Sequence, residues 1–138
     1  SGRQILEVIE DAVANHLDRN GSDGSHPYAA GLRWDLDMSR PRGSRFANVE
    51  IESRADGAWQ ALDPAATYTV VTSDFLAMGG DGYSTLAQIH LAGGSVNTYL
   101  NYTQTFVDYL RAQGRVSRPA AADYSHKTVI SRAGRRLP

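Results

Sequence analysis

The chain has 138 residues, of which 41% are hydrophobic and 21% charged, a composition typical of one globular domain and not of extensive disorder. Fourteen basic residues against fifteen acidic ones give a net charge of −1, so nucleic acid and anionic membrane surfaces are not expected as partners. Cysteine is absent, which excludes disulfide bonds and thiolate chemistry, and no apolar run approaches the ~18 residues of a membrane span.

The first half of the chain predicts one helix and two strands. Residues 4–18 form an amphipathic pattern, in which apolar side chains recur at spacings of four: Ile5, Ile9, Val13 and Leu17. A polar, turn-rich loop over residues 20–30 follows. Strict alternation of apolar and charged residues over 32–38 then predicts a half-buried strand, and residues 45–53 predict a second one.

The second half predicts two strands, a helix and a tail. Tyr68–Thr72 is β-branched and aromatic on both faces, which favours a central strand. A helix is expected over about residues 98–112, with four candidates for the core: Leu100, Phe106, Val107 and Leu110. His126–Ile130 predicts a short last strand, and residues 131–138 predict a loose basic tail.

This order of elements predicts the fold class. The first three predicted strands follow one another with no helix between them, which disfavours a parallel doubly wound sheet. We therefore expect an α+β fold, with a mixed, largely antiparallel sheet packed with two main helices, in one domain over residues 1–130.

Metal and nucleophile motifs are missing from the sequence. The four histidines are His16, His26, His90 and His126, and none belongs to a spacing typical of metal ligands. No Gly-x-Ser-x-Gly elbow is present either. We therefore predict no metal site and no catalytic residue in this chain.

The glycine-rich loop over residues 73–83 is the strongest candidate for a binding site. It combines Phe75, Asp81 and three glycines directly after a predicted strand. Glycines let a backbone approach a ligand closely, an aromatic face stacks on planar rings, and a carboxylate accepts hydrogen bonds from paired hydroxyls. This mixture suits a nucleoside better than a phosphate group, and the alternative is a tight structural turn with Phe75 in the core.

Residues 68–83, YTVVTSDFLAMGGDGY, closely resemble the signature of the C-terminal domain of the 5'-nucleotidase family of metallophosphoesterases. Three further segments resemble the same family in the same order: residues 1–10, residues 31–37 and the Val107–Leu110 region. The resemblance covers about residues 1–130.

The resemblance implies a substrate-recognition role. In family members the corresponding Phe stacks on the base and the corresponding Asp bonds the ribose hydroxyls, which here are Phe75 and Asp81. Gly79 and Gly80 would shape the loop, and Tyr83 would either contact the substrate or pack beneath it. The family hydrolyses nucleotide phosphate esters with two divalent metals held in a separate N-terminal domain, and its members are periplasmic, attached to the cell surface or secreted.

Parts of the family pattern are not visible in this sequence. The chain resembles a C-terminal domain without its start, which in the family supplies a second stacking aromatic and arginines for the phosphate. It also lacks the metallophosphatase domain, the expected partner. One stacking ring is worth about 1–3 kcal/mol per base, so the resemblance implies millimolar nucleotide binding or none, and no hydrolysis, by this chain alone.

Two readings of the function remain open at this level. The chain is either the nucleotide-recognition part of a 5'-nucleotidase-like enzyme, or a stand-alone module that binds nucleosides or proteins without catalysis. If the missing residues leave a sheet edge exposed, self-association through that edge is also expected.

Overall fold

The computed structural model describes residues 1–137; Pro138, the end of the predicted basic tail, lies outside the described residues. In this range the helices are α1 (Gly2–Leu17), α2 (Asp74–Ala77), α3 (Ser84–Leu91) and α4 (Tyr102–Gln113). The strands are β1 (Leu32–Asp37), β2 (Phe46–Glu52), β3 (Trp59–Ala61) and β4 (His126–Ile130). Every helix in residues 1–137 is too short or too polar to cross a membrane.

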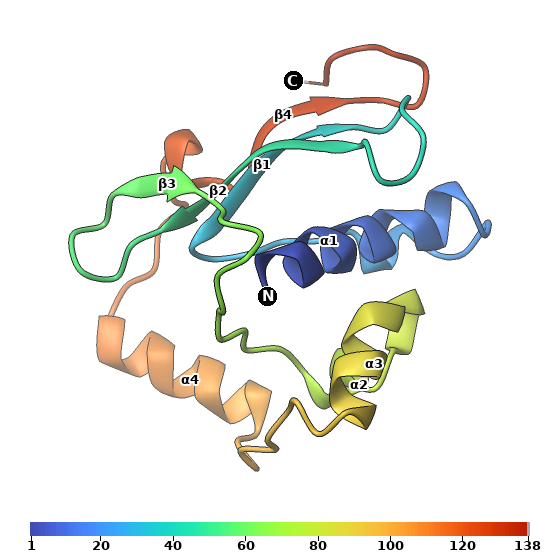
Figure 1. The fold of residues 1–138 in the computed structure, drawn as a ribbon. Coiled ribbons are helices and arrows are strands. Elements are labelled where there is room, and N and C mark those ends of the chain that lie inside the picture. Colours follow the sequence, from blue (N-terminus) through green and yellow to red (C-terminus); the bar gives the residue numbers. More distant parts are fainter. Residues whose placement is uncertain (138) are drawn as a thin grey trace.

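The four strands form one mixed sheet in the order β3-β2-β1-β4 (Figure 1). β1 pairs with β2 in the antiparallel sense and with β4 in the parallel sense, and β2 pairs with β3 in the antiparallel sense. Helices and a mixed sheet in this arrangement confirm the predicted α+β class.

Helix α1 packs against the sheet and forms the core with it. Its apolar stripe brings Ile9, Val13 and Leu17 against Trp34 and Leu36 of β1, which are fully buried. The helix is capped by Ser1 in a capping box. The Ser1 hydroxyl accepts a hydrogen bond from the Gln4 amide, and the Gln4 side-chain oxygen accepts one from the Ser1 nitrogen. The predicted first helix is therefore confirmed.

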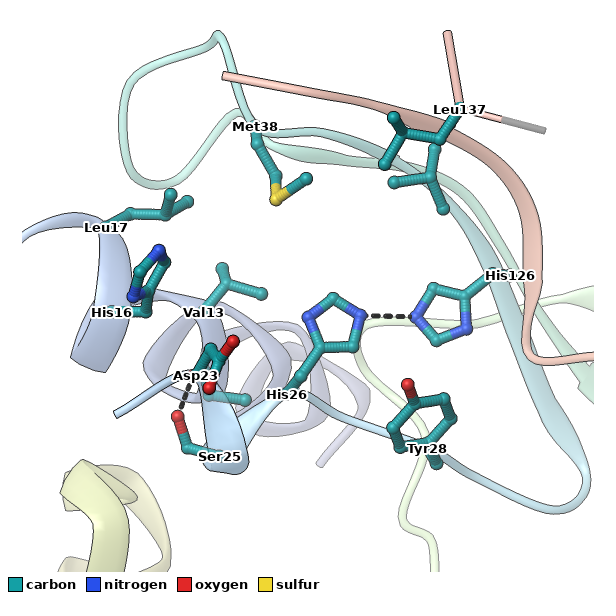
Figure 2. A pocket seen from close by; sticks show the side chains of 12 residues that line it. Val13, His16, Leu17, Asp23, Ser25, His26, Tyr28, Met38, His126 and Leu137 are labelled. Carbon is teal, nitrogen blue, oxygen red and sulfur yellow. Dashed lines mark hydrogen bonds between the residues drawn. The ribbon is translucent and has the colours of Figure 1, made fainter. Parts of the chain in front are cut away.

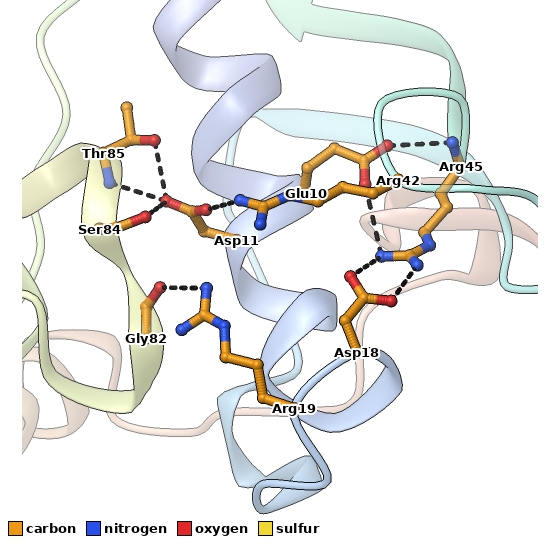
Figure 3. Close-up of polar contacts among 9 residues, drawn as sticks. All are labelled: Glu10, Asp11, Asp18, Arg19, Arg42, Arg45, Gly82, Ser84 and Thr85. Atoms are coloured by element: carbon orange, nitrogen blue, oxygen red, sulfur yellow. Dashed lines mark hydrogen bonds and ion pairs between the residues drawn. The ribbon is translucent and has the colours of Figure 1, made fainter.

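A buried arginine fastens the β1–β2 turn to α1. The Arg45 side chain is 5% exposed and forms ion pairs with Glu10 and Asp18, both at α1 (Figure 3). The Arg45 amide also donates to Glu10 Oε1 at 3.0 Å. The hydrogen bond from Arg45 lowers the pKa of the Asp18 carboxyl below its usual value.

The predicted central strand at Tyr68–Thr72 is wrong. These residues form no strand, the Val71 side chain is 89% exposed, and the third strand is instead β3, nine residues earlier. A strand is defined by main-chain hydrogen bonds to a neighbour, and residues 1–137 offer the Tyr68–Thr72 segment no such neighbour. β propensity alone does not replace that partner.

Two further expectations for the second half need correction. The late helix is α4, which begins after the Asn101 cap. None of the four candidates for the core joins it, because Val107 is only half-buried and the other three are exposed: Leu100, Phe106 and Leu110. In Figure 1, α4 lies away from α1 and from the sheet. The basic tail is not loose over residues 131–137, because the Leu137 amide donates to Val129 O at 2.8 Å and folds this segment back along β4.

Candidate functional site

The glycine-rich loop lies between the end of the exposed Tyr68–Thr72 segment and helix α3. It consists of α2, a 3₁₀ helix at Gly80–Gly82 and the residues on either side of these two turns. Ser73 begins α2 as its N-cap, with the hydroxyl accepting from the Leu76 amide at 3.3 Å. Ser and Asp are typical residues at the start of a helix, and Phe75 is the second residue of the helix that they begin.

Phe75 lies on the surface and its ring is supported by Gly80. The side chain is 53% exposed, so it is not the core residue that the structural-turn alternative requires. A Cβ atom added at Gly80 would lie 2.5 Å from the end of the ring, so only glycine lets the ring rest on the backbone there. The ring is therefore held from below and remains accessible from solvent.

Gly79 and Asp81 adopt backbone conformations that suit a tight turn. Gly79 has φ of +92°, and a Cβ there would lie 2.9 Å from the Ala87 Cβ. Asp81 has φ of +52°, in the left-handed region that Asp tolerates better than most side chains. The Asp81 carboxylate is exposed and has no hydrogen-bond partner among residues 1–137, so it is free to accept bonds from a ligand.

Tyr83 packs beneath the loop and does not face solvent. Its side chain is 7% exposed, and its hydroxyl donates to Ser25 O at 2.9 Å. Burial, together with the negative charges of Asp81 and Asp11, raises the pKa of the Tyr83 hydroxyl. Its contacts support the loop, and a role for Tyr83 in contacting substrate stays a prediction.

Asp11 of helix α1, and Arg19 just beyond the end of that helix, hold the far end of the loop through polar contacts (Figure 3). The Asp11 carboxylate accepts hydrogen bonds from Ser84 and Thr85 at the start of α3 and from Arg42 of the β1–β2 turn. Arg19 Nη2 donates to Gly82 O at 3.5 Å. Sequence reasoning missed Asp11, because it lies among other charged residues of α1 and its partners in α3 are more than seventy residues away. The only signal in the sequence that Asp11 is buried was its place next to the apolar stripe of the helix.

The structure also brings two distant histidines together beside a cavity of about 480 Å³ between α1 and β4 (Figure 2). His26 and His126 point their Nε2 atoms at each other, 2.9 Å apart, with their rings 15° from parallel. One imidazole must donate and the other accept, so at least one of the pair is neutral. Burial, and secondarily the neighbouring His26, lower the pKa of His126 to about 4, and burial also lowers the pKa of His26 although the charge of Asp23 opposes this.

The histidine pair does not extend to a metal centre. Within residues 1–137, no group of three or more His, Asp or Glu side chains is arranged to hold a metal ion. Two ring nitrogens that already share a hydrogen bond would have to turn away from each other to coordinate the same ion. The pair instead joins the loop after α1 to strand β4.

Comparison with known proteins gives the same family from sequence and from structure. The sequence model of the family described as "5'-nucleotidase, C-terminal domain" matches residues 1–88. A probable 5'-nucleotidase of Treponema pallidum is 35% identical over 113 residues, which are 81% of this chain and 19% of that protein. An NAD 5'-nucleotidase of Haemophilus influenzae is 30% identical over 80% of this chain and 19% of its own length.

Two solved structures resemble the chain closely. The NAD nucleotidase of Haemophilus influenzae superposes with a TM-score of 0.75 at 29% identity, over 82% of this chain and 20% of that one. A 5'-nucleotidase precursor from Thermus thermophilus gives a TM-score of 0.73 at 34% identity, over 87% of this chain and 22% of that one. The chain thus spans about a fifth of the length of these relatives.

The histidine pair predicts a pH dependence of stability. Because the folded pKa of His126 lies below the unfolded value, the unfolded chain binds more protons between about pH 6.5 and 4. The contribution of His126 to the free energy of unfolding is therefore complete above about pH 6.5, and it is lost as the pH falls towards 4. His126→Phe removes this group, so its free energy of unfolding should depend less on pH over that range.

Urea unfolding at several pH values measures the free energy of unfolding of the wild type and of His126→Phe. His90→Phe, at an exposed histidine of α3 that hydrogen-bonds only to nearby Ser95, is the matched control and should retain the wild-type slope. An equal slope in His126→Phe and wild type would contradict the assignment.

Proposed function

The chain belongs to the family of 5'-nucleotidase C-terminal domains, and from this premise we propose that it is the nucleotide-recognition part of a larger 5'-nucleotidase-like phosphoesterase. The single observation that carries the proposal is the loop itself. It presents the exposed ring of Phe75, which rests on Gly80, and the exposed carboxylate of Asp81, which has no hydrogen bond within residues 1–137. An aromatic face beside a free carboxylate is the pairing that a nucleoside needs, one for its base and one for its ribose.

In this proposal each residue of the loop has a defined task. Phe75 stacks on the base, and Asp81 accepts hydrogen bonds from the ribose 2'- and 3'-hydroxyls. Gly79 and Gly80 keep side chains out of the space between Phe75 and Asp81, and Tyr83 supports the loop from below. The result is orientation of the substrate, which speeds a reaction by placing the phosphate ester where the hydrolytic machinery acts.

Bond breaking belongs elsewhere in the proposed parent enzyme. The relatives bear the names of phosphoester hydrolases, among them a trifunctional nucleotide phosphoesterase of Bacillus subtilis. In the parent enzyme two divalent metals would activate water and stabilise charge on the phosphate. Residues 1–137 contain no group suited to hold them, so we assign the metals to the metallophosphatase domain, the partner of this chain. A periplasmic, cell-surface or secreted location is part of the same proposal.

The stacking role of Phe75 predicts a specific loss of binding. Adding adenosine, and then AMP, to the chain should shift NMR signals centred on residues 73–83, with a dissociation constant at the millimolar level. Phe75→Ala should weaken binding about tenfold, since a stacked base is worth about 1–3 kcal/mol. Phe106→Ala removes a comparably exposed phenylalanine from α4 and should bind as wild type does. Equal affinity of Phe75→Ala and wild type would rule out stacking on this ring.

The ribose role of Asp81 predicts selectivity for the hydroxyls. Wild type should bind adenosine about tenfold more tightly than 2',3'-dideoxyadenosine, because a hydrogen bond to a charged group contributes about 1.5–3 kcal/mol. Asp81→Asn should lose this selectivity, whereas Asp108→Asn, on exposed α4, should keep it. The same titration measures every pair of ligand and variant, and selectivity that survives in Asp81→Asn would assign the ribose contact to another residue.

A second candidate, an interaction module, is favoured by the Tyr68–Thr72 segment. This segment is uncharged and rich in β-branched residues, and none of its main-chain amides donates to another backbone group of residues 1–137. Such a segment pairs readily with a second copy of itself. We predict that sedimentation will show association that grows with concentration, and that Val71→Lys will remove it. A wild-type chain that stays monomeric at high concentration would exclude this candidate.

A further inference from the structure

The buried carboxylate of Asp11 is the feature of the fold that the proposed function leaves unexplained. Asp11 is 0% exposed, although it lies on a helix whose other face is open to solvent. A buried carboxylate is costly unless hydrogen bonds and an opposite charge compensate for the water that it loses. The partners that compensate Asp11 therefore indicate what the residue holds in place.

Three of these contacts lie at the start of α3. Asp11 Oδ2 accepts from the Thr85 amide at 2.7 Å, from the Thr85 hydroxyl at 2.8 Å and from the Ser84 hydroxyl at 2.9 Å. Asp11 Oδ1 accepts from the Arg42 guanidinium, which balances the charge. Both oxygens thus have hydrogen-bond partners (Figure 3).

The geometry is that of a helix cap supplied by another helix. The first amides of a helix need acceptors, which a side chain at the N-cap usually provides. The N-cap of α3 is Tyr83, whose side chain makes no capping bond. Asp11 takes over this task from α1, and its negative charge also suits the positive end of the α3 helix.

The cap lies immediately after the residue that the proposed function assigns to the ribose. Asp81 precedes Ser84 by three residues, has a left-handed backbone and makes no side-chain hydrogen bond within residues 1–137. Nothing at Asp81 itself fixes its carboxylate, so its position depends on the backbone that follows it. That backbone is anchored at Gly82 through Arg19, at Tyr83 through its hydroxyl, and at Thr85 through Asp11.

We propose that Asp11 is a positioning residue of the nucleoside site, which fixes the Asp81 carboxylate by capping α3 from α1. This inference rests on the proposed function for the identity of the ligand, a nucleoside. The capping of α3 by Asp11 does not depend on the proposed function. It assigns to α1 a role in substrate recognition without any contact between α1 and the nucleoside.

Asp11→Asn tests the proposal, since the substitution keeps the shape and replaces one acceptor oxygen by an amide nitrogen. In the full chain without ligand, the Thr85 amide should exchange with solvent about tenfold faster, whereas the Leu36 amide in β1 should not change. The affinity for adenosine should fall about tenfold, and the double variant Asp11→Asn/Asp81→Asn should bind no more weakly than Asp81→Asn alone. Glu7→Gln, on the exposed face of α1, should match wild type in every measurement.

A second variant keeps the test decisive if Asp11→Asn does not fold. Ser84→Ala/Thr85→Val removes two hydroxyl donors but leaves the carboxylate paired with Arg42 and with the amide of residue 85. It should show a smaller change in the same direction. Wild-type exchange at residue 85 together with wild-type affinity for adenosine, in whichever variant folds, would overturn the proposal, and so would an additive loss in the double variant.

Failure of the proposed function has a different signature. If adenosine causes no shifts in the wild-type chain, the nucleoside assignment fails, and the exchange measurement still decides the role of Asp11. Faster exchange confined to residues 81–85 in Asp11→Asn would support positioning of the loop, whereas unchanged exchange there would overturn it.

Discussion

A buried negative charge organises this fold. The carboxylate of Asp11 can be buried only because Arg42, Ser84 and Thr85 compensate for its lost hydration. These partners come from the β1–β2 turn and from α3, so one side chain of α1 joins the sheet region to the glycine-rich loop. Arg45 makes the reciprocal contact, as a buried cation that holds the same turn against Glu10 and Asp18. The polar layer around α1 thus fixes geometry that apolar packing alone would leave adjustable.

The candidate site combines a rigid frame with groups that have no partner of their own. Phe75 rests on Gly80 and faces solvent, and Asp81 projects from a strained backbone without a hydrogen bond in residues 1–137. An exposed aromatic ring and a left-handed aspartate both cost stability, and such costs gather where a ligand can offset them. Tyr83 and Asp11 make this frame, since Tyr83 packs beneath the loop and Asp11 caps α3 from α1.

Sequence patterns predicted the elements whose causes are local. α1, β1, β2 and β4 follow from side-chain periodicity, and the loop stood out through its glycines. The central strand at Tyr68–Thr72 failed because pairing depends on a neighbour that a window of sequence does not contain. β3 is too short to show a period. Helix α3 escaped notice because its start has no capping side chain of its own, the cap being Asp11, far away in the sequence. The resemblance to a family supplied the roles of Phe75 and Asp81, which composition left open between a site and a turn.

The parallel pairing of β1 with β4 has a consequence for the order in which the sheet forms. The contact between His26 and His126 spans 100 residues, and it lies where β4 begins. α1, β1, β2 and β3 are all contained in residues 2–61, so they are synthesised before β4 and can collapse around Trp34. One edge of strand β1 then stays unpaired until residues 126–130 have been synthesised and pair with it. Contacts of such long sequence separation form slowly, which makes the last strand the step that completes the sheet.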